Sequence, residues 1–243
     1  MTHVGIITQA RMTSTRLPGK VLLQAAGRSM LDHHLDRLGV AELDVYVATT
    51  LNGSDDPIVA IARSRGLGVY RGSEHDVLAR FHECADRNQL DVVVRVTSDC
   101  PLVDGSLIAE AVEFFVSEDD PWLYVSNGLE RTFPRGLDFE VFSAAALAEA
   151  HANAQGAAER EHVTPYLYDN VGGRMRLHNV GWHVNKSNYR ITLDTLADLE
   201  VIRSLIEDYS AHLLDCAGII SVLDGHPELV QRNAHVEQRK LDE

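Results

Sequence analysis

The first 120 residues alternate short apolar runs, rich in valine and isoleucine, with longer segments that repeat apolar residues at helical spacing. Strands are expected at Val4–Thr8, Asp44–Thr49, Gly68–Tyr70 and Val92–Thr97, and helices at Met30–Leu38, Pro57–Arg65, Asp76–Arg87 and Gly105–Val116. Such an alternation predicts a mostly parallel sheet with right-handed crossovers and helices on both faces. We therefore expect the α/β fold class.

After residue 120 the expected strands and helices no longer alternate regularly. Short strands are expected at Trp122–Ser126, Phe139–Phe142, Met175–Val180 and Tyr189–Thr192, and helices at Ser143–Ala154 and Thr195–Tyr209. The sequence contains neither an internal repeat nor a Pro/Gly-rich linker. We therefore expect a single domain over residues 1–243, in which residues 121–243 elaborate the sheet that residues 1–120 begin.

Composition narrows the class of protein further. Hydrophobic residues make up 45% of the 243 residues, which is enough for a proper core. The formal net charge of −14 argues against a general binder of nucleic acid or of membrane surfaces. The three cysteines are widely spaced, and no apolar run suits a signal peptide or a membrane span. We expect a soluble, cytoplasmic protein.

Cations gather in the loop after the first expected strand. The segment QARMTSTRLPGK (Gln9–Lys20) holds three cations, and residues 1–31 hold four cations and no acid. In a parallel α/β sheet, ligands bind beyond the carboxyl ends of the strands, where this loop would lie. Arg11, Arg16 and Lys20 are therefore interpreted as facing an anion, with a solvated basic loop as the alternative.

Two common phosphate-binding motifs do not fit this loop. A Walker A motif would need Gly at the position of Ser14 and Ser or Thr at the position of Val21. The one near match to a dinucleotide fingerprint, Gly66–Gly72, leads from a helix into a strand rather than from a strand into a helix. The loop therefore indicates an anion site of another kind.

Seven further segments follow the loop: ATTLNGSDDPIV, YRGSEHDVLARF, RVTSDCPLVD, RTFPRGLDFEVF, EREHVTPYLY, YRITLDTLADLEVI and NAHVEQRK. Together with QARMTSTRLPGKVL, they resemble the CMP-sugar-acid synthetase (acylneuraminate cytidylyltransferase) superfamily, in its branch of the spore-coat polysaccharide biosynthesis protein F type. The resemblance covers nearly the whole chain. It implies a glycosyltransferase-A-like nucleotidyltransferase fold and transfer of CMP from CTP, with release of pyrophosphate.

The resemblance also implies roles for residues of the first half. The residues expected to bind CTP are Arg11, Ser14, Arg16 and Lys20 at the triphosphate, Arg71, Gly72, Ser73 and Asp76 nearer the base, and Thr97 beside Asp99. Mg²⁺ prefers one or two carboxylates together with phosphate oxygens. Asp99 and Asp194 each follow an expected strand and are the expected metal ligands; with Arg11 and Lys20 they form the expected catalytic set. The alternatives are a turn residue before Pro101 for Asp99, and helix N-caps for Asp194 and Asp76.

Charged residues of the second half are expected to bind the acceptor. They are Arg131, Arg135, Asp138, Glu140, Arg160, Glu161 and His162. Arginine suits a carboxylate, a phosphate or a phosphonate. Surface ion pairs are the alternative for the arginines and acids, and a buried core histidine is the alternative for His162. The segment Gly225–Gln238 is too polar for a core helix and is expected to be a dimer contact or a solvated tail.

We therefore expect a CTP- and Mg²⁺-dependent cytidylyltransferase that acts on a small anionic acceptor, either a sugar acid or a phosphorylated or phosphonate acid, and that forms a homodimer. One alternative is a nucleotide-sugar-dependent glycosyltransferase. Such enzymes normally carry an Asp-x-Asp motif, whereas the segment SDCP at Ser98–Pro101 has a single acid. The other alternative is a protein that binds nucleotide without turnover.

Overall fold

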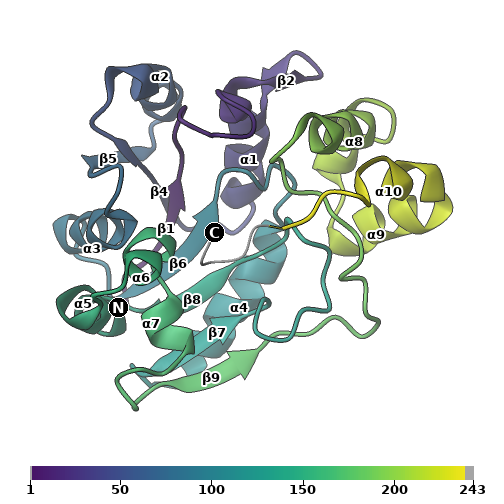
Figure 1. Ribbon diagram of the computed structural model, residues 1–243. Helices are drawn as coiled ribbons and strands as arrows, with labels where there is room; N and C mark the ends of the chain where they lie inside the picture. The colour runs from purple at the N-terminus through teal and green to yellow at the C-terminus, as the bar shows by residue number, and fades with distance from the viewer. Residues whose placement is uncertain (1, 239–243) are drawn as a thin grey trace.

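The computed structural model describes residues 2–238, and a seven-stranded sheet lies at its centre (Figure 1). The strands, in spatial order, are β5 (Gly68–Gly72), β4 (Asp44–Thr50), β1 (Val4–Gln9), β6 (Val92–Thr97), β8 (Glu140–Ser143), β7 (Leu123–Ser126) and β9 (Arg176–Asn179). Within this sheet β8 is antiparallel to both neighbours, and the remaining pairs are parallel. The expected α/β class with a mostly parallel sheet is confirmed.

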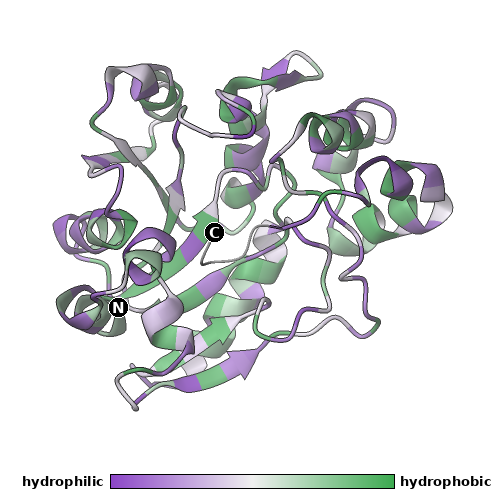
Figure 2. Cartoon of the chain, viewed as in Figure 1, coloured by the Kyte–Doolittle hydropathy of each residue, from purple (hydrophilic) through white to green (hydrophobic). Residues whose placement is uncertain are grey.

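Helices cover both faces of the sheet, as the alternation predicts. One face carries α1 (Met30–Gly39), α2 (Asp56–Ser64) and α4 (Gly105–Ser117), and the other carries α3 (Val77–Arg87), α5 (Ala144–Asn153) and α7 (Pro165–Tyr168). In β1, Ile6 packs with the first group and Ile7 with the second, because successive strand residues point to opposite faces. Burial on both faces explains why the central strands read as continuous apolar runs, which Figure 2 shows as hydrophobic colour.

A third apolar cluster lies beside the sheet and belongs to the C-terminal helices. These are α8 (Leu196–Glu207), α9 (Cys216–Gly225) and α10 (Pro227–Asn233), seen at one side of the molecule in Figure 1. They pack against Leu17 of the first loop and Ala25 of a small antiparallel pair, β2 (Gln24–Ala25) and β3 (Arg28–Ser29). The C-terminal helices therefore pack against the cationic loop and support it.

Several short elements were not expected from the sequence. Besides β2, β3, α7, α9 and α10, they are α6 (Ala157–His162) and the 3-10 turns η1 (Lys20–Leu22), η2 (Gly53–Asp55) and η3 (Ala211–Leu213). Each spans ten residues or fewer, so the hydrophobic period has little length in which to repeat.

The strand expected at Tyr189–Thr192 is wrong. Only Arg190 pairs there, through a single parallel bridge to Arg135 within the described chain. The Arg135 N–H donates to the Tyr189 carbonyl at 2.9 Å, and the Ile191 N–H donates to the Arg135 carbonyl at 2.7 Å. This segment is therefore a buried extended connection, in which the consecutive residues from Arg190 to Asp194 are all buried, rather than a strand of the sheet.

The segment Gly225–Gln238 is neither a simple tail nor wholly polar surface. It includes α10, whose Leu229 and Asn233 are 1% and 2% exposed. Beyond α10, the chain turns back toward the middle of the molecule (Figure 1), where Gln238 accepts a hydrogen bond from Arg190. Polar residues of this segment, such as Gln238, therefore hydrogen-bond to buried side chains instead of facing only solvent.

No helix in the described range 2–238 has both the length and the apolar character that spanning a membrane requires.

Candidate functional site

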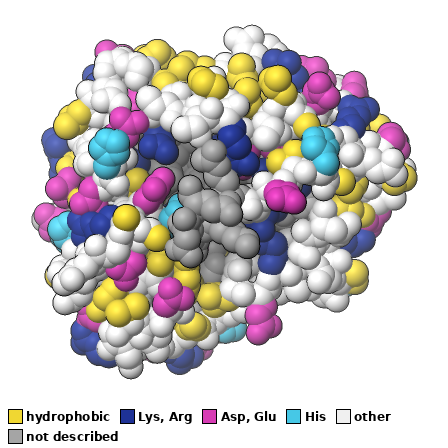
Figure 3. Space-filling model, in the orientation of Figure 1, with side chains coloured by type: hydrophobic (Ala, Val, Ile, Leu, Met, Phe, Trp, Pro, Cys, Tyr) yellow, Lys and Arg dark blue, Asp and Glu magenta, His cyan; other side chains and the backbone are white. Residues whose placement is uncertain are grey.

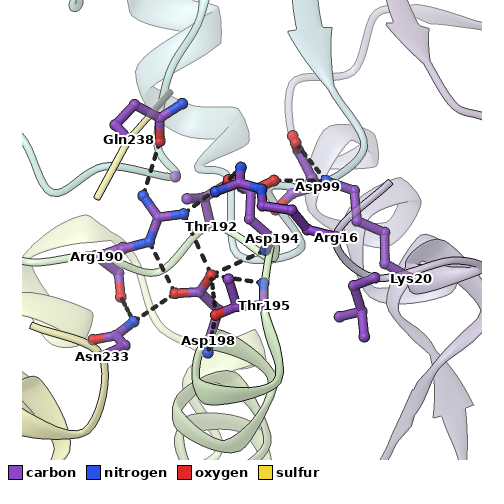
Figure 4. Close-up of polar contacts among 12 residues, drawn as sticks. Arg16, Lys20, Asp99, Arg190, Thr192, Asp194, Thr195, Asp198, Asn233 and Gln238 are labelled. Atoms are coloured by element: carbon purple, nitrogen blue, oxygen red, sulfur yellow. Dashed lines mark hydrogen bonds and ion pairs between the residues drawn. The ribbon is translucent and has the colours of Figure 1, made fainter. Parts of the chain in front are cut away.

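The first loop leaves the sheet at its switch point. β1 pairs with β4 on one side and with β6 on the other, so the connections after β1 and β6 diverge at this edge. Crevices at such points are the usual ligand sites of α/β sheets. The loop after β1 brings Arg16 and Lys20 to this crevice, and the turn after β6 brings Asp99 (Figure 4).

A buried carboxylate fixes the beginning of the loop. Asp55 is fully buried and accepts hydrogen bonds from the Met12 N–H at 2.8 Å and from the hydroxyls of Thr49 and Thr50 at 3.0 and 2.5 Å. Burial would raise the pKa of Asp55, but these hydrogen bonds lower it below its usual value. The loop is therefore tied to the end of β4 before it reaches the crevice.

Lys20 lies between two carboxylates from distant parts of the chain. Its Nζ is 2.9 Å from Oδ2 of Asp99 and 2.9 Å from Oδ1 of Asp194. Gly19, directly before the 3-10 turn of Lys20, has a φ of 69°, a conformation that glycine adopts without strain. The second oxygen of Asp194 is 2.9 Å from the Arg16 guanidinium. Two loop cations and two acids therefore meet at one point.

The connection before α8 is held against Asp99. The Asp99 carbonyl accepts the Leu193 N–H at 2.7 Å and the Thr192 hydroxyl at 3.2 Å. Asp194 follows directly and is 8% exposed. These backbone contacts explain how carboxylates 95 positions apart in the sequence come to share one ammonium group.

The charges of this cluster reinforce one another. Burial would raise the pKa of Asp99, but the charge of Lys20 and the hydrogen bond from Thr97 Oγ1, at 2.5 Å, lower that pKa to about 2. Burial alone would lower the pKa of Lys20, and the two carboxylates raise it above its usual value. Asp99 and Lys20 are therefore both ionised near neutral pH.

The two carboxylates fit a divalent cation. Asp99 and Asp194 each direct an oxygen at the same ammonium nitrogen, so both already face one cation position. Hard carboxylate oxygens are ligands that Mg²⁺ prefers, together with phosphate oxygens and water. Within the described part of the chain, no group of three or more His, Cys, Asp or Glu side chains could hold a metal ion. Oxygens from a bound phosphate and from water could complete the ligands of an ion here.

Three residues expected at the nucleotide lie apart from this cluster. Arg11 is 3.8 Å from Glu74, on the side of the β5–α3 loop. Ser14 Oγ accepts the Leu17 N–H at 3.4 Å within the first loop. Arg71 donates to the carbonyls of Thr50 and Asn52, at 2.8 and 2.7 Å, and to Asp56 at 2.7 Å. Its donors are thus occupied by the β4–α2 loop.

The loop after β5 contains the other residues expected near the base. Ser73 Oγ accepts the Asp76 N–H at 3.0 Å, and Asp76 caps α3 by accepting the Ala79 N–H at 2.9 Å. Beneath them lies Arg80, which the sequence analysis did not identify. It is 2% exposed and donates to the Ser73 carbonyl at 2.6 Å. A Cβ on Gly72 would lie 3.2 Å from its side chain, so Arg80 and Gly72 pack closely under this loop.

A cavity of about 420 Å³ opens beside the carboxylates. Thr97 lines the cavity and also donates to Asp99, so it connects the two sites. Five of the seven residues expected at the acceptor line it, together with others that the sequence analysis did not single out: Arg131, Arg135, Asp138, Glu140 and His162, with Arg95, Tyr124, Ser126, Thr164 and Tyr168. Arg160 and Glu161 are not among its lining residues. Arg160 instead pairs with Asp76, and Glu161 is exposed.

One of the three arginines of the cavity lacks a polar partner. Arg95 pairs with Glu140, and Arg131 pairs with Asp138. Across residues 2–238, the half-buried guanidinium of Arg135 makes neither a hydrogen bond nor an ion pair. Burial, followed by the charge of Arg131, lowers the pKa of Arg135. The cavity therefore holds one positive charge that no acid of the described chain neutralises through direct contact.

Glu140 is the most extensively bonded acid of the cavity. Besides bonding Arg95, it accepts hydrogen bonds from the hydroxyls of Tyr124 and Thr164, each at 2.7 Å.

A single arginine in the valine-rich strand β6 is the sequence signal that could have identified Arg95. Arg190, four residues before Asp194, had no comparable signal, and its partner Gln238 lies 48 positions away. On the face shown in Figure 3, Lys and Arg side chains are seen around the centre.

The sequence matches the family model described as cytidylyltransferase over residues 5–234. An uncharacterized protein of Methanocaldococcus jannaschii is 36% identical over 250 residues, which cover 100% of this chain and 99% of that protein. The spore coat polysaccharide biosynthesis protein SpsF of Bacillus subtilis is 29% identical, over 94% of this chain and 97% of its own length.

Two other similarities concern part of the chain and its fold. The 3-deoxy-manno-octulosonate cytidylyltransferase of Solibacter usitatus is 37% identical over 121 residues, which are 48% of this chain and 46% of that protein. The solved structure of a cytidylyltransferase from Leptospira borgpetersenii has a TM-score of 0.91 and 32% identity, covering 99% of this chain and 100% of that one.

Proposed function

Because the chain belongs to the cytidylyltransferase family, we propose that it transfers CMP from CTP to a sugar acid, with release of pyrophosphate. The observation that carries this proposal is the position of Thr97. It lines the cavity and bonds Asp99, so an acceptor in the cavity would lie beside the Lys20–Asp99–Asp194 cluster. Catalysis of phosphoryl transfer consists mostly of such positioning, together with charge stabilisation.

The loop cations would bind the triphosphate. Arg16 and Lys20 lie at the switch point, and both contact carboxylates that a metal ion could take over. Arg11 lies nearer Glu74 and would act from the side of the β5–α3 loop, where the base is expected. Asp99 and Asp194 would hold Mg²⁺, which supplies positive charge for the phosphate oxygens when bound.

The charge of the cavity favours a sugar acid over a phosphorylated or phosphonate acid. Among its described lining residues, arginines outnumber carboxylates by one, since Arg95 and Arg131 are paired there and Arg135 is not. A carboxylate carries one negative charge and matches that excess, whereas a phosphate group carries nearly two. The hydroxyl of Tyr168 lies on the same lining and could bond a hydroxyl group of a sugar. The relative from Solibacter usitatus, whose name specifies a sugar acid, supports the same class.

In the proposed reaction, a hydroxyl oxygen of the acceptor forms a bond to the α-phosphorus of CTP. The bond from this phosphorus to the oxygen shared with the β-phosphorus breaks, and its electron pair leaves with pyrophosphate. The hydroxyl proton of the acceptor passes to solvent water. The role of the protein is to align the two reactants. Arg135 would hold the acceptor carboxylate, and Arg16 and Lys20 would hold the leaving phosphates.

The experiment is pyrophosphate release with Mg²⁺, each of the four NTPs, and a panel of sugar acids, sugar phosphates and phosphonates. Release with CTP and a sugar acid, together with a CMP-linked product in the mass spectrum, supports the proposal. Release only with another NTP would overturn the base assignment, and release only with phosphonates would overturn the acceptor class. Sugar transfer from a nucleotide sugar, without pyrophosphate release, would favour a glycosyltransferase.

A homodimer forms part of the same proposal. β9 is an edge strand, Leu177 within it is 43% exposed, and nearby Val171 is 61% exposed. Exposed apolar residues along a sheet edge favour association. Light scattering tests this directly. A monomeric mass would contradict the dimer without affecting the proposed reaction.

A further inference from the structure

We propose that Arg190 is a positioning residue that fixes the metal-binding carboxylate of Asp194, and that residues 233–238 hold Arg190 in place. The proposal rests on the proposed function, because it takes Asp194 as a metal ligand. It concerns residues that neither the loop nor the cavity includes. Figure 4 shows these side chains converging from α8, from α10 and from the segment that follows α10.

Every nitrogen of the Arg190 guanidinium has a partner. One terminal nitrogen is 2.8 Å from Oδ2 of Asp194, Nε is 2.9 Å from Oδ1 of Asp198, and the other terminal nitrogen is 2.9 Å from Oε1 of Gln238. Arg190 is 9% exposed. A planar guanidinium that is bonded through all three of its nitrogens is held in one orientation, so its contact with Asp194 is fixed.

Asp198 holds both the side chain of Arg190 and the backbone of Asp194. It is fully buried and accepts the backbone N–H groups of Asp194 and Thr195, at 3.1 and 2.9 Å. Asn233 adds a third segment, since its amide donates to Oδ1 of Asp198 at 2.9 Å and to the Arg190 carbonyl at 3.0 Å. The main chain and the side chain of Asp194 are thus anchored through one buried carboxylate.

This arrangement gives the two oxygens of Asp194 different neighbours. Oδ1 faces Lys20, which also contacts Asp99, so Oδ1 is the oxygen directed toward the shared cation position. Oδ2 is shared by Arg16 and Arg190. Arg16 belongs to the loop proposed to bind phosphates and would exchange its partner when CTP binds. Four of the five N–H donors of Arg190 are engaged by Asp194, Asp198 and Gln238, so it would keep Oδ2 in place and leave Oδ1 for the metal.

The C-terminal segment therefore has a role in the site. Residues that orient metal ligands typically change metal affinity or activity by about 10- to 100-fold when they are altered. The Arg190 side chain bonds Asp194, Asp198 and Gln238 in the described contacts, and neither Lys20 nor a side chain of the cavity lining. Its backbone pairs with that of Arg135, and a change of side chain keeps that bridge. Its loss should accordingly weaken metal binding but leave metal-free CTP binding, which depends on the loop, unchanged.

The test measures binding without turnover. Mn²⁺ affinity is determined by electron paramagnetic resonance in the presence of a CTP analogue with a methylene group between the α- and β-phosphorus atoms, and binding of the same analogue without metal is determined by calorimetry. For Arg190→Lys, which keeps the charge but not the fork, we expect roughly 10-fold weaker Mn²⁺ binding and an unchanged affinity for the analogue without metal.

Two further variants keep the test decisive. Gln238→Ala alters an exposed residue that bonds only Arg190 among the described contacts, so it should fold normally and show a smaller loss of Mn²⁺ affinity than Arg190→Lys. Arg232→Ala is the matched control on α10, because Arg232 is exposed and bonds Ser204 instead; its Mn²⁺ affinity should equal that of the wild type. Unchanged Mn²⁺ affinity in both Arg190→Lys and Gln238→Ala would overturn the proposal. Absence of Mn²⁺ binding in the wild-type complex would overturn the metal assignment, and this proposal with it.

Discussion

Lys20 and Asp99 lie 79 positions apart in the chain, yet the Lys20 ammonium donates to the Asp99 carboxylate at 2.9 Å. The same nitrogen reaches Asp194 at the same distance. A lysine thus bridges the two acids that are proposed to bind Mg²⁺. Positive charge at this point is what the two carboxylates require, and either the ammonium or a metal ion can supply it.

Asp194→Asn should abolish turnover while leaving the fold intact. The amide keeps the shape of the side chain but loses the charge that a metal ion needs, and Lys20 keeps Asp99 as its partner. Loss of several kcal/mol of transition-state stabilisation corresponds to roughly a 1,000-fold or larger fall in kcat. Pyrophosphate release measures the rate, and circular dichroism checks the fold. Retained activity in a folded variant would remove Asp194 from the metal site.

Arg135→Ala should weaken binding of the acceptor but not of CTP. Arg135 lines the cavity and has no polar partner among residues 2–238, so an acceptor anion is the partner it can gain. Hydrogen bonds to charged groups contribute about 1.5–3 kcal/mol, so the KM for the acceptor should rise roughly 10- to 100-fold. Arg160→Ala is the contrast, because Arg160 pairs with Asp76 outside the cavity lining and should leave that KM unchanged. Equal effects of both substitutions would contradict the assignment.

Gly136→Ala should destabilise the protein. Gly136 has a φ of 109°, and a Cβ there would lie 2.6 Å from the Ile191 carbonyl carbon. Backbone strain of this kind costs on the order of 1–3 kcal/mol, and the clash would add to it. Gly27→Ala is the control, because Gly27 has a φ of 74° but open space around it. Urea unfolding should show a larger loss for Gly136→Ala; equal losses would mean that the close approach to Ile191 has no cost.

Stability should fall between pH 6.5 and pH 4 because of His34. Burial lowers the pKa of His34 from 6.5 to about 4, and its ring bonds the Thr8 hydroxyl at 2.8 Å and the Cys100 carbonyl at 2.9 Å. Between these pH values the unfolded chain binds a proton that the folded chain does not, so stability is fully present above pH 6.5 and is lost as the pH falls toward 4. The contribution is on the order of 2–3 kcal/mol.

Urea unfolding from pH 7 to pH 4 checks this expectation. Wild type should lose more stability over this interval than His34→Gln, which has no proton to gain. His235→Gln, at an exposed position, should follow the wild-type curve. Parallel curves for wild type and His34→Gln would show that His34 is not the source of the pH dependence.

The alternation of residues predicted the first four parallel strands and their helices because each of these elements is long enough to show its period. Asp99 and Asp194 could be placed at strand ends by the same reasoning, although the second of these ends belongs to a single bridge. Arg71 and Arg160 show the limit of the method. In the sequence, an arginine that contacts a ligand cannot be distinguished from one that contacts another part of the protein. Arg71 contacts the Thr50 carbonyl, and Arg160 contacts Asp76.

The sequence by itself determined the α/β alternation, the cationic loop after β1 and the family resemblance, because each depends on residues that lie close together in the sequence. Tertiary structure alone decided which cation meets which acid. Lys20 reaches Asp99 and Asp194, the Arg135 side chain is left without a polar partner among residues 2–238, and Arg190 is joined to Gln238. These pairings depend on where segments far apart in the chain pack against each other, and side-chain contacts of a few ångströms leave no periodic trace in the sequence.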